Sequence, residues 1–240
     1  MEKVSAIICV FNEERTLRNV ILSAVQNQYI DEVIVVNDGS TDSSRTIIDS
    51  LHDELDFKSI MLVRNMGKGY AMAVGVENAK NEILFFIDAD QVKIPQNYIG
   101  KMLTIFSHET CGMVLGYSTV KIGFFDVNPL KILTGERVVL KKDIVQILNK
   151  MKESRFGVET LMYLHFKSLD KKIRYTRLKG LKHNDKFKKT TVTNATKRYL
   201  QETWEICLSA VKNYDLIFKI FIITIRNKPD HDNIISGSSN

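Results

Sequence analysis

Two acidic residues one position apart, Asp88 and Asp90, directly follow the apolar run Ile83–Ile87. Two carboxylates at the end of a buried strand would repel each other unless a cation balanced them. Oxygen ligands of this kind suit Mg²⁺ or Mn²⁺, which the phosphates of a substrate can help to hold. Such a cation would stabilise the charge that grows on a departing diphosphate. A polar turn that caps the next helix is the alternative interpretation of these residues.

A further acidic residue, Asp38, lies in the loop Asn37–Asp42, directly after the apolar run Glu32–Val36. A carboxylate at this position can accept a hydrogen bond from an N–H group of a uracil-type base. Ser40 and Asp42 in the same loop can serve only as caps of the following helix.

The loop Asn65–Gly69 contains Gly67 and Lys68 and resembles a phosphate-binding loop in part. It is not a Walker A loop, because the first glycine is missing and Tyr70 stands where Ser or Thr is needed. Glycines, a lysine and a helix N-terminus can nevertheless hold a phosphate, and Arg64 could add positive charge. The alternative is an exposed loop lysine.

Four apolar runs suit strands buried on both faces: Val4–Val10, Glu32–Val36, Ile60–Val63 and Ile83–Ile87. They alternate with segments of helical periodicity at Leu17–Val25, Ile47–Leu55 and Gly69–Ala79. This alternation predicts βαβ units and a mainly parallel sheet, in which ligands bind at the carboxyl ends of the strands. The polar groups that follow the four strands should therefore meet at one edge: Asn12–Glu13, Asp38, Arg64–Lys68 and Asp88–Asp90.

The second half is less regular. Helices are predicted at Gln96–Phe106, Val138–Met151, Val158–Leu169, Thr193–Val211 and Leu216–Ile225, and strands at Met113–Tyr117 and Ile173–Leu181. Phe124–Leu133 should be a loop or short helix, and the tail from Lys228 should be disordered. We expect one domain over residues 1–213, with halves at 1–120 and 121–191, followed by a helix and tail at 214–240.

Composition and charge fit a globular protein, with 240 residues, 44% hydrophobic and 26% charged, and a net charge of +6. Residues 167–189 contain ten Lys or Arg and two Asp, a net of +8. Such a segment could face phosphates, an anionic acceptor or an anionic membrane, or it could be a solvated surface. Cys9, Cys111 and Cys207 show neither a metal spacing nor a disulfide pattern. With no secretory signal, these features predict a cytoplasmic protein, with peripheral membrane contact left open.

The segments Val10–Glu14, Val36–Asp42, Asn65–Gly69 and Asp88–Asp90 resemble those of the family 2 glycosyltransferases of GT-A fold. Order and spacing both match, over residues 3–120, although Asn37 stands where the family usually has Asp. The resemblance implies an α/β fold with helices on both faces of a mainly parallel sheet. It also implies that Asp38 contacts the nucleobase, that Asp88 touches the ribose or sugar side of the donor and that Asp90 binds the metal. Asp88 is a further candidate ligand of that metal. The donor site that the resemblance implies comprises Val10, Phe11, Asn12, Glu13, Asp38, Arg64, Gly67, Lys68, Asp88 and Ala89.

Three later segments, Thr134–Arg137, Phe156–Glu159 and Leu181–Asn184, are similar to those of glucosyl-3-phosphoglycerate synthases and their small relatives. This similarity implies that His183 completes the metal site and that Glu159 lies near the acceptor. The residues alone leave other interpretations open. His183 could be an exposed histidine, Glu136 could only pair with Arg137, and Glu159 could only stabilise a helix N-terminus.

We therefore predict transfer of a sugar from a nucleotide diphosphate, expected to be UDP, to a hydroxyl or phosphate acceptor, with Mn²⁺ or Mg²⁺. Asp90 and Glu159 are the catalytic candidates, followed by Glu136. The acceptor could be a small anionic molecule, or a polyprenyl phosphate or glycolipid at a membrane surface. The apolar segment Leu216–Ile225 motivates the second option, although it could instead pack on the domain. We expect no nucleic acid partner, and a homodimer is left open.

Two other classes of protein agree less well with the sequence. A sugar nucleotidyltransferase would need a glycine-rich loop after the first strand, and Val10–Glu14 contains no glycine. A non-catalytic basic module that binds a membrane or nucleic acid would leave the acidic motif after the fourth strand unexplained.

Overall fold

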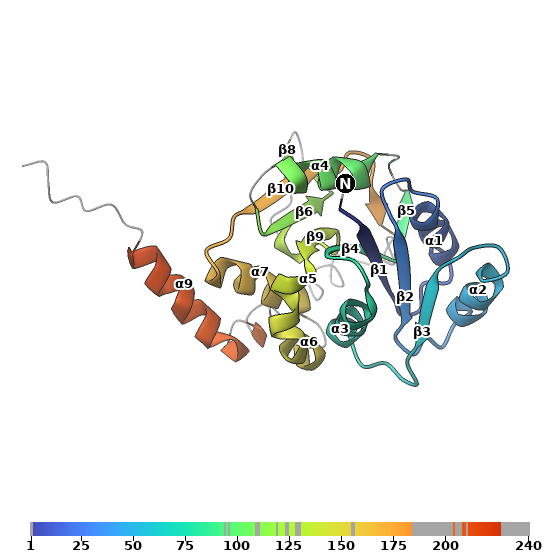
Figure 1. Ribbon diagram of the computed structural model, residues 1–240, viewed down its shortest axis with the longest axis horizontal. Helices are drawn as coiled ribbons and strands as arrows, with labels where there is room; N and C mark the ends of the chain where they lie inside the picture. The colour runs from blue at the N-terminus through green and yellow to red at the C-terminus, as the bar shows by residue number, and fades with distance from the viewer. Residues whose placement is uncertain are drawn as a thin grey trace, which may run out of the picture.

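The protein folds around one large sheet with helices on both faces, and helix α9 (Tyr214–Arg226) projects beyond it (Figure 1). This is a computed structural model. It describes residues 2–93, 95, 97–108, 111–118, 120–122, 125–127, 131–154, 157–183, 204, 208–209 and 211–226. Within the described residues no helix is long and apolar enough to cross a membrane.

The large sheet has seven strands in the order β10-β6-β9-β4-β1-β2-β3. All neighbouring pairs are parallel except those of β9, which runs antiparallel to both β4 and β6. The predicted mainly parallel sheet is thus confirmed. The strands are β1 (Val4–Val10), β2 (Glu32–Asn37), β3 (Lys58–Met61), β4 (Ile83–Asp88), β6 (Met113–Tyr117), β9 (Arg137–Leu140) and β10 (Ile173–Arg177).

The helices divide between the two faces of the sheet. Alternate residues of β1 enter different cores: Ile8 packs with the helices α1, α2 and α4, and Ile7 packs with α3, α6 and α7. Helix α3 lies especially close to β1, because a Cβ added to Gly75 would be 2.4 Å from Cγ2 of Ile7. The bounds are α1 (Leu17–Val25), α2 (Ser44–Leu51), α3 (Lys68–Asn78), α4 (Tyr98–His108), α5 (Lys141–Ile144), α6 (Leu148–Ser154) and α7 (Val158–Ser168).

The predicted helix Val138–Met151 is wrong at its start, where residues 138–140 belong to β9. Val138 and Val139 are fully buried between β4 and β6, and β-branched residues fit such a central strand well. The helical part begins at Lys141, as α5, a 3₁₀ turn at Val145–Ile147 and α6.

The ends of several strands also differ from the sequence predictions by a few residues. Strand β3 lies two residues earlier than predicted, because Val63 is fully exposed, and β10 ends at Arg177 rather than at residue 181. The predicted loop or short helix at 124–133 contains a strand, β8 (Phe125–Val127), paired with β7 (Val120–Ile122), and a 3₁₀ turn at Lys131–Leu133.

Two short strands were not predicted, and they matter for the site. They are β5 (Gln91–Lys93) and β11 (Lys182–His183), which pair antiparallel. The apolar helix predicted at Leu216–Ile225 is confirmed as α9. Most of the helix predicted at 193–211, and the tail from Lys228, lie outside the described residues.

Candidate active site

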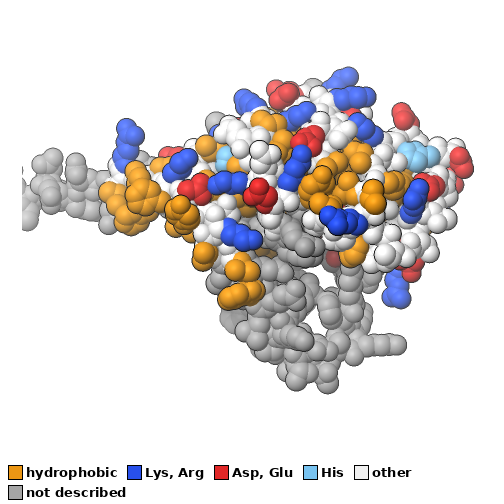
Figure 2. Space-filling view, turned by 90° about the horizontal axis from the view of Figure 1, so that it is seen from below, with side chains coloured by type: hydrophobic (Ala, Val, Ile, Leu, Met, Phe, Trp, Pro, Cys, Tyr) orange, Lys and Arg blue, Asp and Glu red, His pale blue; other side chains and the backbone are white. Residues whose placement is uncertain are grey.

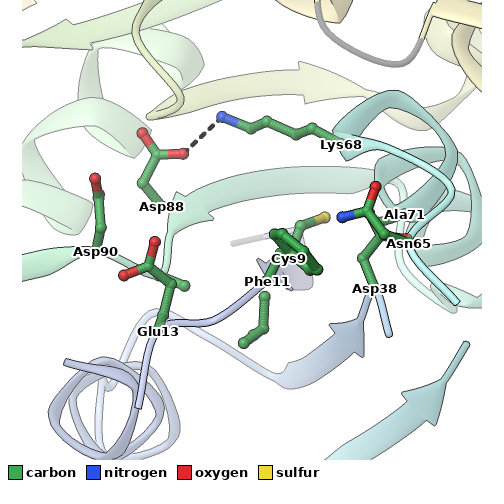
Figure 3. Close-up of a pocket in the computed structure, with 11 residues that line it drawn as sticks. Cys9, Phe11, Glu13, Asp38, Asn65, Lys68, Ala71, Asp88 and Asp90 are labelled. Atoms are coloured by element: carbon green, nitrogen blue, oxygen red, sulfur yellow. Dashed lines mark hydrogen bonds and ion pairs between the residues drawn. The ribbon is translucent and has the colours of Figure 1, made fainter. Parts of the chain in front are cut away.

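A cavity of about 240 Å³ opens where the carboxyl ends of β1, β2 and β4 meet the N-terminus of α3 (Figure 3). Most of the polar residues predicted to converge line this cavity, whereas Asn12 and Arg64 do not. Four lining residues carry carboxylates and one carries an ammonium group. The lining consists of Cys9, Val10, Phe11, Glu13, Asp38, Asn65, Lys68, Ala71, Asp88, Ala89 and Asp90.

The loop after β1 is tied to the loop after β2. Asn12 has a φ of 56°, in the left-handed region that asparagine tolerates better than most residues. Its side-chain oxygen accepts a hydrogen bond from the backbone N–H of Thr41 at 2.8 Å, and its own N–H donates to the hydroxyl of Ser40 at 3.0 Å. Asn12, predicted to line the nucleoside pocket, is not in the cavity lining; its side chain instead shapes the loops that surround it.

Asp38 holds the loop that leads into α3. Its two carboxylate oxygens accept hydrogen bonds from the backbone N–H groups of Met66, at 2.7 Å, and Gly67, at 2.9 Å. The residue lines the cavity but is only 3% exposed. The carboxylate predicted to contact a nucleobase is therefore engaged with backbone amides, although its oxygens retain further lone pairs.

Arg64 and Gly67 lie in the same loop but outside the cavity lining. The backbone of Arg64 packs directly on Gly39, where an added Cβ would lie 2.3 Å from the Arg64 carbonyl carbon. Gly39 has a φ of 67° and Gly67 a φ of 98°, and these left-handed values favour glycine at both turns. The two loops thus fit together through positions that only glycine fills without strain.

Lys68, the first residue of α3, places its ammonium group between two carboxylates from distant parts of the chain. Its Nζ lies 2.8 Å from Oδ1 of Asp88 and 2.6 Å from Oε1 of Glu159. Burial acts to lower the pKa of Lys68, but the two carboxylates outweigh it, and the pKa stands well above its usual value. Lys68 is therefore a permanent cation at neutral pH.

The turn Asp88–Asp90 is held from two sides. The hydroxyl of Thr16 donates a hydrogen bond to the carbonyl oxygen of Ala89 at 2.7 Å. The α-carbon of Gly135 packs so closely on Asp88 that an added Cβ would lie 1.9 Å from Oδ1. Figure 3 shows the carboxylates of Asp88, Asp90 and Glu13 on the same side of the cavity. Carboxylate oxygens are the ligands that Mn²⁺ and Mg²⁺ prefer, so the chemistry of this donor set fits such a metal.

The predicted third metal ligand, His183, is the last residue of β11, far along the chain from Asp88 and Asp90. Its backbone pairs with Gln91, the residue that directly follows Asp90. The side chain of His183 lies outside what the structure describes. Among the side chains that are described, no group of three His, Cys, Asp or Glu residues is arranged to hold a metal ion.

Glu136 and Glu159, the two predicted catalytic glutamates, have different surroundings. Glu136 has no exposed surface, and its oxygens accept hydrogen bonds from the side chains of Gln91 at 2.7 Å and Thr134 at 2.9 Å. A carboxylate buried in this way joins neighbouring segments and is closed to a substrate. Glu159 lies in the first turn of α7, where the helix dipole favours a negative charge, and it reaches the site through Lys68.

Comparison with known proteins agrees with this geometry. The sequence profile described as "Glycosyl transferase family 2" matches residues 5–173, more than half of the chain. The chain belongs to glycosyl transferase family 2. Its first 120 residues carried that resemblance in the sequence, and the match extends through β9 and α7 to the start of β10.

Relatives of this chain in sequence are longer than the chain itself. The chain is 33% identical over 93 residues to a poly-beta-1,6-N-acetyl-D-glucosamine synthase of Staphylococcus epidermidis. The aligned segment covers 38% of this chain and 23% of that protein. It is 32% identical over 117 residues to the putative glycosyltransferase EpsH of Bacillus subtilis. The aligned segment covers 48% of this chain and 33% of that protein. The chain thus spans about a quarter to a third of the length of these relatives.

Among solved structures, the glucosyl-3-phosphoglycerate synthase of Mycobacterium tuberculosis superposes on this chain with a TM-score of 0.64 and 17% identity. The match covers 87% of this chain and 80% of that one. TarS of Staphylococcus aureus gives a TM-score of 0.58 and 19% identity over 75% of this chain and 59% of that one. The predicted GT-A fold is confirmed by these likenesses, which at such identities concern the fold alone.

Several residues at the candidate site were not found from the sequence, among them Cys9, Thr16 and Arg137. Cys9 lines the cavity, and burial raises the pKa of its thiol to about 12, so that the thiol stays protonated. Its position in β1, opposite Asp88 of β4, could have been inferred once the two strands were paired. Thr16 contacts Ala89 across 73 positions, and no local sequence signal marks such a contact.

Arg137, which the sequence also did not single out, is completely buried. Its guanidinium donates hydrogen bonds to the carbonyl oxygens of Ile132, Thr134 and Glu159, and so connects the turn before β9 to the start of α7. Burial lowers its pKa, although the nearby carboxylates of Glu159, Asp88 and Glu136 act in the opposite direction. Arg137 therefore fixes the backbone that carries Glu159.

Proposed function

We propose that the protein transfers a sugar from a nucleotide diphosphate, expected to be UDP, to an oxygen acceptor with the help of Mn²⁺ or Mg²⁺. The observation that carries the proposal is the meeting of Asp88, Asp90 and Lys68 at one cavity on the carboxyl edge of the sheet. A divalent cation and a lysine at a helix N-terminus are the groups that a departing diphosphate requires.

The nucleoside would occupy the part of the cavity formed by Val10, Phe11 and Glu13. Phe11 is 41% exposed and can cover one face of a base. The cavity volume of about 240 Å³ is below the roughly 300–1,000 Å³ typical of small-molecule sites, so the sugar would extend beyond it. Asp38 would act by fixing the loop of Met66 and Gly67 beside the base.

The diphosphate would lie between the acidic turn and the start of α3. Asp88, Asp90 and His183 would hold the metal, which when bound would supply charge stabilisation of the leaving diphosphate. Lys68 would add a further positive charge, and Arg64 could approach from the same loop. The M. tuberculosis synthase of the same fold has been crystallised with Mn²⁺ and UDP, which supports this assignment.

Glu159 would orient the acceptor or take a proton from its oxygen. It is 8% exposed, lies at the N-terminus of α7 and contacts the lysine that also contacts Asp88. A general base of this kind accounts for about 10²–10⁴ in rate. Glu136 is left out of the proposed chemistry because it is fully buried.

The decisive experiment is a panel of UDP-, GDP- and CDP-sugars tested for slow hydrolysis with Mn²⁺, Mg²⁺ or a chelator. We expect release of UDP from one UDP-sugar, dependent on a divalent metal and absent in Asp90→Asn. Calorimetric titration of UDP with and without Mn²⁺ should show tighter binding with the metal. If no nucleotide sugar binds or hydrolyses under any of these conditions, the proposal fails and a non-catalytic basic module becomes the better interpretation.

We further propose that the enzyme works at an anionic membrane surface, which would favour a lipid-linked acceptor. Helix α9 buries Leu216 against the domain, whereas Phe218, Phe221 and Ile225 on its other side are 55–62% exposed. Figure 2 shows hydrophobic side chains, with basic ones among them, on the projecting part of the molecule. Thirteen residues are too few to span a bilayer but can lie flat on its surface.

The charges of α9 agree with this orientation. Lys219 and Arg226 are exposed, and the acidic Asp215 is already paired with Lys150 at 2.8 Å. We expect the protein to sediment with anionic vesicles at low salt and to be released by high salt or by the double change Phe218→Glu and Phe221→Glu. Val145→Glu, which alters an exposed apolar residue away from α9, is the matched control. Equal sedimentation of both variants would contradict the proposal.

A further inference from the structure

Lys68 forms an ion-paired bridge across the candidate site. Its ammonium contacts Asp88, at the end of β4, and Glu159, at the start of α7, at 2.8 and 2.6 Å. These two residues are the ones assigned above to the metal and to the acceptor. The bridge therefore links two parts of the proposed chemistry through one cation.

The surroundings of the bridge are rich in negative charge. Glu13, Asp38, Asp88 and Asp90 line the cavity together with Lys68. Carboxylates crowded at a partly buried site destabilise one another unless a cation compensates them. Lys68 supplies such compensation, because its ammonium lies 2.8 Å from a carboxylate oxygen of Asp88 and 2.6 Å from one of Glu159.

The side chain of Lys68 is positioned so that its ammonium group can change partners. Lys68 is the first residue of α3, follows Gly67, and keeps 33% of its side chain exposed. A lysine is a compact charge on a flexible stem, and a helix N-terminus is a favourable site for a phosphate. The side chain can thus exchange two carboxylates for a diphosphate without any change in the backbone.

We propose that Lys68 is the resident counter-ion of the metal-free site, and that binding of the metal–nucleotide pair displaces it from Asp88 and Glu159. This inference rests on the proposed function. It predicts that a divalent metal binds weakly alone, because the metal competes with an ammonium already in place. It also predicts that Glu159 becomes available to the acceptor only once the donor has drawn Lys68 away.

The test measures Mn²⁺ binding without nucleotide, using the electron paramagnetic resonance signal of free Mn²⁺. The Kd of Lys68→Met for Mn²⁺ should be at least about tenfold lower than that of the wild type. Removal of the ammonium charge beside Asp88 has a large electrostatic effect on a cation bound there. The matched control is Lys152→Met, which removes the lysine of another ion pair, to Glu77 at 2.5 Å, and should bind Mn²⁺ as the wild type does.

Two further measurements keep the outcomes distinct. Lys68→Gln retains two hydrogen-bond donors without the charge, and it should show the same gain if Lys68→Met does not fold. Lys68→Arg should keep the weak binding of the wild type. If neither neutral variant binds Mn²⁺ more tightly, the counter-ion role is overturned, even when the wild type binds UDP with Mn²⁺ and hydrolyses a UDP-sugar. If the wild type does neither, the proposed function itself fails.

Discussion

Two regions support the candidate site by different means. The strand-edge loops, residues 11–14, 38–44 and 64–67, hold one another through hydrogen bonds to backbone N–H groups, such as those of Asp38 with Met66 and Gly67. The buried bridge, residues 134–137, has its polar groups inside the protein, where Glu136 and Arg137 are completely buried. The first region sets the shape of the cavity, whereas the second holds charged residues in position beneath it.

This difference has energetic consequences. A hydrogen bond near the surface can be replaced by water, so its loss is usually modest. A charged group with no exposed surface has no such replacement, and its neighbours are left unsatisfied when it is removed. Changes in the buried bridge should therefore mainly affect stability, and changes at the cavity should mainly affect activity.

The largest effect is expected for Asp90→Ala, a change at the cavity itself. Loss of a metal ligand should lower kcat for UDP-sugar turnover by about 10³-fold or more, because the leaving diphosphate loses its main charge stabilisation. Steady-state release of UDP measures this effect, and the thermal midpoint should change little. Metal-dependent turnover at the wild-type rate in this variant would show that Asp90 is not needed to hold the metal.

Arg137→Met tests the buried bridge. We expect a loss of about 3 kcal/mol in the free energy of unfolding, because the carbonyl oxygens of Ile132, Thr134 and Glu159 lose their donor. Urea denaturation measures it. Arg18→Met, which removes an exposed arginine paired with Glu54, is the control and should change stability little. A small effect of Arg137→Met would contradict the contrast between the two regions.

Glu159→Gln, compared with Glu136→Gln, distinguishes a catalytic glutamate from a structural one. It should reduce kcat by about 10²-fold, less than Asp90→Ala does, because a general base contributes less than the metal. Glu136→Gln should instead lower stability with a smaller effect on kcat, since its carboxylate is buried and bonded to Gln91 and Thr134. The reverse order of these two effects on kcat would exchange the roles assigned to the glutamates.

Asp38→Asn weakens the strand-edge loops. The amide retains one acceptor oxygen, so one of the N–H groups of Met66 and Gly67 loses its partner, at a cost of about 1–2 kcal/mol. The loop before Lys68 should become less well ordered, and the Kd for UDP should therefore rise. Calorimetric titration measures this Kd. Ser50→Ala, which removes an exposed hydroxyl on α2, provides a control for general effects of substitution. Unchanged UDP affinity would argue against a role for this loop in donor binding.

The smallest effect is a pH dependence of stability from His165, on the helix that carries Glu159. Burial lowers its pKa; Asp143 acts to raise it, while Lys171 and Lys150 lower it further. The unfolded chain therefore takes up a proton first, so the free energy of unfolding should fall as pH falls below about 6.5. Urea titrations at pH 7.5 and 5.5 measure the loss, which should shrink in His165→Gln and persist in His52→Gln. If the wild type and both variants lose the same free energy of unfolding between pH 7.5 and 5.5, the pH dependence comes from groups other than His165.

Much of the first region could be predicted from the sequence. The strands that end before Asn12, Asp38 and Asp88 are continuous apolar runs, and parallel strands bring their carboxyl ends together at one edge. The buried bridge could not be found in this way. Val138–Leu140 was predicted to be helical, because a short apolar run does not reveal by its period alone whether it forms a strand or a helix.

The sequence by itself determined which residues could do chemistry and that most of them follow strands, since these depend on residue type and local periodicity. Only the tertiary structure decided which of these residues meet. Lys68 contacts Glu159 across 91 positions, Thr16 contacts Ala89 across 73, and the backbone of His183 pairs with Gln91 across 92. Such contacts arise from the packing of α1, α7 and β11 against other parts of the fold, and packing depends on the whole chain at once.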